Sequence, residues 1–126
     1  MSAAREKILG EIAAERVRQD ARWGEQNHPD VDRVLTGRPT GCRVERMAME
    51  YNIPSANSAR EACDHAARIG QCTWAHILVE EIAEAVEAAT LAQLGQGPLA
   101  ALRKELVQVA AVAVSWIEAI DRRGER

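Results

Sequence analysis

The apolar residues of this chain recur at the spacing of α-helices and do not alternate with polar ones as they do in β-strands. Between residues 3 and 22 they stand among many charges, which predicts an amphipathic first helix ending at Trp23-Gly24. Residues 24–42 then contain three glycines and two prolines. Such a density of helix and strand breakers predicts a long loop, and long loops in small domains are often functional.

Two shorter helices are predicted next. One precedes Pro54, and the other is expected to open with a capping box formed by Ser58 and Glu61 and to stop at Gly70. Alanine is abundant, phenylalanine is absent and there is one tyrosine, so long strands are not expected. The fold class predicted from these patterns is all-α.

The last two helices are predicted to form an antiparallel hairpin, around which the helical bundle is built. Thr73 can cap the first of them, over residues 74–93, and Pro98 suits the first position of the second, which runs to about residue 122. The buried stripes are predicted to be Trp74, Leu78, Ile82, Ala85, Val86 and Ala89 on the first helix, and Leu99, Leu102, Leu106, Val109, Ala113, Trp116, Ile117 and Ile120 on the second.

The last helix also carries Val107, Ala111 and Val114 on its far side, so it is expected to be buried on two faces. Either the N-terminal helices of the same chain cover this second face, or another subunit does. Both alternatives stay open, because a domain this small often gains additional buried surface from another subunit.

Length and charge narrow the possible functions. The 126 residues fit one domain, 1–126, and a net charge of −3 with scattered Lys and Arg argues against a nucleic-acid partner. Without a signal peptide or an apolar run of about 20 residues, the chain is expected to be cytoplasmic and not membrane-bound. Its three cysteines, Cys42, Cys63 and Cys72, include no CxxC pair, which suits a reducing compartment and predicts no disulfide framework.

Oxygen-bearing side chains flank the predicted seam of the hairpin. At about 100° per residue, Glu81 and Glu84 lie side by side next to one apolar stripe, and Glu105 and Gln108 take the equivalent flank of the next helix. Because Glu84 and Glu105 are almost equally far from the turn, all four side chains can converge at one level between the helices.

Three carboxylates at the edge of a core repel one another unless a cation compensates them. Hard oxygen ligands favour Mg²⁺, with Mn²⁺ as a substitute, and Mg²⁺ usually completes its shell with water and substrate phosphates. Glu80 or Glu84 could then accept a proton from a metal-bound water. A second interpretation stays open, in which these acids are solvated on exposed helix faces or pair with Arg103 and Lys104.

Two separated motifs resemble those of the MazG-like all-α nucleoside triphosphate pyrophosphohydrolases. The first is Glu80-Glu81-x-x-Glu84 followed, after 20 intervening residues, by Glu105-x-x-Gln108. The second is Glu15-Arg16-x-x-Gln19 with Trp23-Gly24-x-Gln26-x-His28-Pro29, which is similar to the opening of a MazG-like subgroup. The resemblance therefore reaches both ends of the chain, and residues 30–70 match least well.

The resemblance implies an all-helical dimer or tetramer that hydrolyses a nucleotide between its α and β phosphates, releasing a monophosphate and pyrophosphate. It also implies that Glu81, Glu84 and Glu105 are magnesium ligands. Gln108 stands where the family usually has Asp; its carbonyl can coordinate a metal but carries no charge. The alternative is therefore a weakly active or inactive relative that only binds nucleotide or metal. A third hypothesis is a purely structural oligomerisation module, suggested by the two-faced last helix.

The candidate substrate-binding residues are Arg16, Gln19, Trp23, Gln26 and Lys104. Trp23 could stack on a base while Arg16 or Gln26 contacts phosphate or base edges, or it could cap the core. A zinc site can also be drawn from Cys63, His65, Cys72 and His76, although their spacing fits no recognised zinc module.

Overall fold

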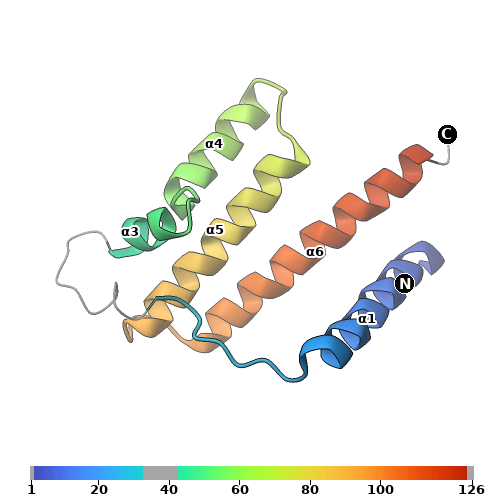
Figure 1. Ribbon diagram of the computed structural model, residues 1–126. Coiled ribbons are helices and arrows are strands. Elements are labelled where there is room, and N and C mark those ends of the chain that lie inside the picture. Colours follow the sequence, from blue (N-terminus) through green and yellow to red (C-terminus); the bar gives the residue numbers. More distant parts are fainter. Residues whose placement is uncertain (1, 33–42, 125–126) are drawn as a thin grey trace. The chain divides into compact units, whose positions relative to one another are not determined.

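The computed structural model describes residues 2–32 and 43–124, and every regular element in these ranges is an α-helix (Figure 1). The all-α prediction is confirmed for this part of the chain. None of its helices has an apolar stretch long enough to cross a membrane. The second part of the predicted loop, with Cys42, lies outside the described residues. The helices are α1 (Ala3–Trp23), α3 (Arg43–Glu50), α4 (Ala56–Arg68), α5 (Trp74–Gln93) and α6 (Leu99–Gly124).

The N-cap of α4 differs from the predicted one. The Ser55 hydroxyl accepts a hydrogen bond from the Ser58 amide at 3.2 Å, so Ser58 lies within the first turn and the predicted capping box with Glu61 is wrong. Both serines can cap a helix, and the side chains alone did not distinguish them. Thr73 does cap α5: its hydroxyl accepts from the His76 amide at 3.2 Å, and its own amide donates to the His76 ring at 3.1 Å.

The chain divides into two compact units, residues 1–28 with 111–126 and residues 29–110. In the first unit, Ile8 of α1 is almost completely buried. The Arg5 guanidinium of α1 forms an ion pair with Glu118 of α6 at 3.3 Å. That residues 1–126 form a single domain stays a prediction.

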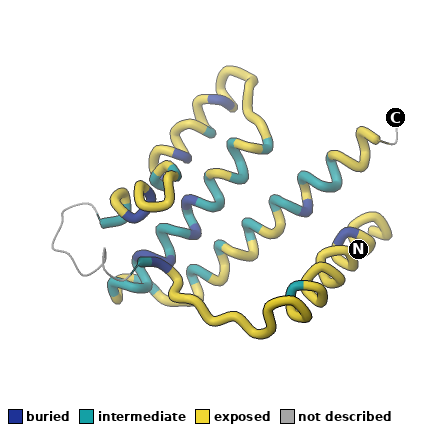
Figure 2. The backbone as a smooth tube through the Cα atoms, viewed as in Figure 1, coloured by how far each residue is buried: buried dark blue, intermediate teal, exposed yellow. Residues whose placement is uncertain are grey.

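The second unit is built on α5, against which α3 and α4 both pack. Figure 2 shows that its buried positions fall mainly on these helices. Alanines at the α4–α5 contact have small side chains that let the two backbones approach closely, and this approach carries α4 side chains to the polar edge of α5. One buried cluster comprises Val31, Met47 and Ala89, with Val86 and Leu102 packed against it, and the other comprises Ala56, Ala59 and Ala83.

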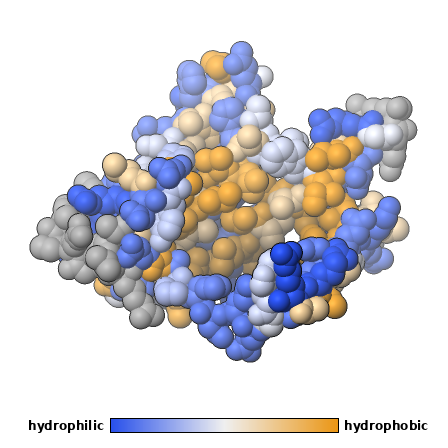
Figure 3. All heavy atoms as spheres, viewed as in Figure 1, coloured by the Kyte–Doolittle hydropathy of each residue, from blue (hydrophilic) through white to orange (hydrophobic). Residues whose placement is uncertain are grey.

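The α5–α6 hairpin is present, and Gly95 in the connection adopts the positive φ of 73° that this turn requires. The predicted burial of α6 is partly wrong, because its main apolar stripe includes the exposed residues Leu99, Leu106 and Ile120. On the far side, Val114 is buried as predicted, whereas Val107 is exposed. A 3.6-residue period locates apolar stripes but does not tell which of two stripes the chain covers. Figure 3 shows apolar side chains gathered on the surface over α5 and α6.

The methionines of α3 provide a matched test of this packing. Met47 is completely buried, whereas Met49, two residues later, is 71% exposed. Met47→Ala should lower the free energy of unfolding by about 2–5 kcal/mol, because it leaves a cavity against α5. Met49→Ala should change it by no more than about 0.5 kcal/mol. Urea denaturation of both variants measures the difference, and equal losses would contradict the assigned core.

Candidate metal centre

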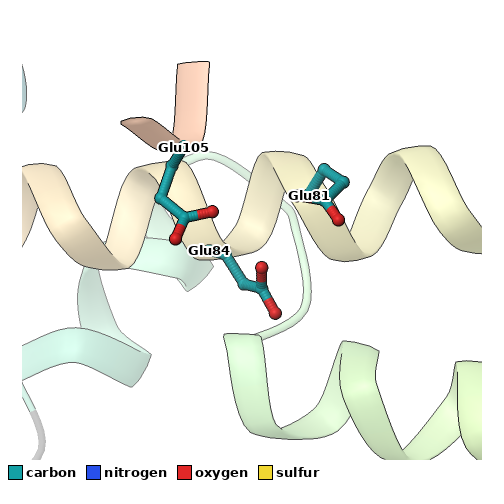
Figure 4. Close-up of side chains that lie close together, drawn as sticks. All are labelled: Glu81, Glu84 and Glu105. Carbon is teal, nitrogen blue, oxygen red and sulfur yellow. The ribbon is translucent and has the colours of Figure 1, made fainter. Parts of the chain in front are cut away.

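Three glutamates converge between α5 and α6. Glu81 and Glu84 stand one helical turn apart on α5, Glu105 stands on α6, and one oxygen from each side chain lies within 4.8 Å of the others (Figure 4). All three side chains are half-buried. In residues 2–32 and 43–124, this is the one cluster of three or more acidic, histidine or cysteine side chains with such spacing.

Two oxygens of this cluster lack the partners that buried polar atoms normally have. Oε2 of Glu81 and Oε2 of Glu105 are buried and accept no hydrogen bond within the described part of the chain. Burial raises the pKa of Glu81, and the charges of Glu84, Glu105 and Glu80 raise it further. Burial and the neighbouring Glu84 also raise the pKa of Glu105, against a partial offset from Lys104 and Arg60. The ionised cluster is therefore electrostatically unfavourable when it stands alone.

This donor set fits a divalent cation. Carboxylate oxygens are hard ligands of the kind that Mg²⁺ and Mn²⁺ bind. A cation placed among them would give the two unpartnered oxygens a ligand and relieve the repulsion between the charges. The cluster can hold such an ion, and the predicted convergence of Glu81, Glu84 and Glu105 is confirmed.

A side chain from a third helix joins the cluster. The Arg60 guanidinium of α4 donates to Glu84 at 3.3 Å and forms an ion pair with it. Together with Glu84 and Glu105 it borders a surface depression of about 290 Å³. Sequence reasoning missed Arg60, because a lone arginine in the segment that matched least well gave no signal of its position.

The other predicted residues of this unit surround the cluster. Glu80 is half-buried and accepts a hydrogen bond from the Cys63 thiol. Gln108 is half-buried on α6, one turn beyond Glu105, and the exposed Lys104 acts on Glu105 through its charge. Their assigned roles as proton acceptor, metal ligand and substrate contact stay predictions.

The remaining substrate-binding candidates lie in the first unit. Arg16 donates to Gln19 at 2.7 Å and to Asp20 at 2.8 Å, so its guanidinium is held along α1. Arg16 and Gln26 also line a depression of about 540 Å³ at the end of this helix. Trp23 is 54% exposed, which argues against the interpretation that it caps the core. Binding of substrate by these residues stays a prediction.

The zinc site drawn from two cysteines and two histidines is not assembled in the described residues. Cys63 and Cys72 do meet, with their Sγ atoms 3.9 Å apart. The Nδ1 atom of His76, however, lies 2.7 Å from the Thr73 hydroxyl and serves the helix cap.

The raised pKa values predict how stability depends on pH without divalent cations. Because the folded state binds protons at Glu81 more tightly than the unfolded state does, ionisation of this carboxyl opposes folding at neutral pH. That penalty disappears as the pH falls through the raised pKa towards the ordinary value of 4.5. Glu81→Gln should therefore increase the free energy of unfolding at neutral pH, with a gain that shrinks in acid. Urea titrations in EDTA at several pH values measure it.

The matched control is Glu61→Gln, since Glu61 is an exposed carboxylate on α4. This change should stay within about 0.5 kcal/mol of the wild type. Destabilisation by Glu81→Gln at neutral pH in EDTA would contradict the assigned repulsion.

No family model, curated protein or solved structure matches this chain. In the described residues the chain is all-α, with five helices and a half-buried glutamate cluster that could hold a metal ion.

Proposed function

We propose that this chain is a magnesium-dependent nucleotide pyrophosphohydrolase that cleaves a nucleoside triphosphate, or a related nucleotide, between its α and β phosphates. The observation that carries this proposal is the convergence of Glu81, Glu84 and Glu105 beside a depression that also presents a guanidinium. The resemblance of the two sequence motifs to MazG-like enzymes supports it. Self-association as a dimer or tetramer, in the cytoplasm, belongs to the same proposal.

The residues of the cluster have different roles in the proposed reaction. Glu81, Glu84 and Glu105, with the Gln108 carbonyl, would hold the cation, which screens phosphate charge and acidifies a bound water. A carboxylate such as Glu80 or Glu84 takes the proton of the attacking water. The water oxygen bonds to the α phosphorus as the bridging P–O bond breaks, so that pyrophosphate leaves and a monophosphate remains.

Arg60 extends this proposal to the substrate. Its guanidinium offers several N–H donors in a planar fork that suits phosphate oxygens, and it lies at the rim of the depression. The same guanidinium forms an ion pair with Glu84. A cation bound to Glu84 would compete with that ion pair and leave the guanidinium available to a phosphate chain.

The second candidate function is a nucleotide or metal sensor without turnover. Gln108 favours it, because a neutral amide in place of a fourth carboxylate weakens attraction for the cation. This candidate retains the metal cluster and the depression but assigns no proton transfer to Glu80 or Glu84. Binding of Mg²⁺ and nucleotide in calorimetry, with no product formed, would favour the sensor.

Hydrolysis is tested with purified protein, Mg²⁺ or Mn²⁺ and a panel of nucleoside triphosphates, with pyrophosphate as the readout. Glu84→Gln should lower the rate by about 100-fold or more, since it removes a metal ligand and a candidate base. It should leave the melting temperature of the metal-free protein no lower than that of the wild type. Glu61→Gln is the control and should retain the wild-type rate. Absence of pyrophosphate from every nucleotide with either metal would contradict the enzyme assignment.

Substitution of Arg60 separates its two assigned contacts. Arg60→Gln should raise KM by about tenfold or more, the cost of losing a charged hydrogen bond to phosphate. The same change should tighten Mg²⁺ binding, because Glu84 loses a competing cation. Calorimetry with Mg²⁺ alone and steady-state kinetics measure the two effects. Arg68→Gln, two turns later on α4, is the control, and unchanged KM in Arg60→Gln would refute the phosphate contact.

A further inference from the structure

Two cysteines approach each other at the end of α5 opposite the α5–α6 turn. Cys63 is half-buried on α4, and Cys72 is exposed in the connection between α4 and α5. Their Sγ atoms are 3.9 Å apart, and both thiols are free. The Cys63 thiol also donates a hydrogen bond to Glu80.

The thiol pair adjoins the glutamate cluster through the register of α4 and α5. Cys63 follows Arg60 by one helical turn on α4, and Glu80 precedes Glu84 by one turn on α5. The Cys63–Glu80 and Arg60–Glu84 contacts are therefore successive cross-links between the same two helices. A chemical change at Cys63 acts one turn away from the candidate metal centre.

Only a small movement separates these thiols from a covalent bond. A disulfide requires its sulfurs to come within about 2.05 Å of each other. Cys72 lies in the short connection over residues 69–73, outside both helices, so rotation of its side chain and adjustment of this connection can close the gap.

We propose that Cys63 and Cys72 are a redox modification site, which a low-molecular-weight disulfide such as oxidised glutathione converts reversibly into an intramolecular disulfide. The two cysteine thiols are oxidised, and one molecule of oxidised glutathione is reduced to two of glutathione. An excess of dithiol reductant reverses the reaction. The site does not depend on the proposed hydrolase activity.

The environments of the two thiols set the order of the steps. Cys72 is exposed, so its thiolate attacks the oxidant first, forms a mixed disulfide and releases one glutathione thiolate. The hydrogen bond to Glu80 and, to a smaller extent, burial raise the pKa of Cys63 to about 12. This thiol therefore stays protonated during the first step. Cys63 then attacks Sγ of Cys72, loses its proton to the buffer and expels the second glutathione.

Trypsin makes the product easy to identify, because Arg68 lies between the two cysteines. The experiment uses the full chain carrying Cys42→Ser, treated with oxidised glutathione, blocked with an alkylating agent and digested without reduction. We expect peptides 61–68 and 69–103 to appear as one species, lighter than their sum by two hydrogen atoms. Dithiothreitol should separate them again.

Two further variants test the assigned order. Cys63→Ser should accumulate a stable glutathione adduct on Cys72, because the second thiol that expels it is missing. In Cys72→Ser, Cys63 should react with oxidised glutathione several-fold more slowly than Cys72 does in Cys63→Ser, because Cys63 is half-buried. The proposal is overturned if the parent chain carries glutathione on both cysteines, links only to a second copy or remains unmodified.

Discussion

The structure of the second unit depends on how three half-buried carboxylates are kept together. Glu81 and Glu84 of α5 and Glu105 of α6 bring one oxygen each to within 4.8 Å of the others. Burial and mutual charge raise the pKa of Glu81 and Glu105, and one oxygen of each finds no hydrogen-bond partner among residues 2–32 and 43–124. Such an arrangement is costly in a purely structural helix pair, and it becomes favourable when a cation occupies it.

The site belongs to three helices, because α4 supplies the side chains that face the acidic edge of α5. Alanines bring α4 close to α5, and the antiparallel register then places Arg60 against Glu84 and a thiol against Glu80. One contact compensates a carboxylate charge, and the other gives Glu80 a hydrogen-bond donor. The same packing therefore determines the electrostatics of the cluster and positions the cysteine pair.

Much of this arrangement could be predicted from the helical periodicity of the sequence. The spacing of Glu81, Glu84 and Glu105 about a short turn was enough to predict their convergence, because helix geometry within one hairpin is local. Arg60 could not be found in this way, since its position depends on packing between separate helices. For the same reason the apolar stripes of α6 were identified, but Leu106, which was predicted to be buried, is exposed.

The charges of the cluster affect whether a neutral residue at position 108 suits a metal centre. Three ionised glutamates carry three negative charges, of which a divalent cation would compensate two. A fourth carboxylate at position 108 would add repulsion to a site whose burial already raises the pKa of two members. A neutral amide can still offer its carbonyl oxygen as a ligand. A neutral Gln108 is thus compatible with a metal centre built on three glutamates.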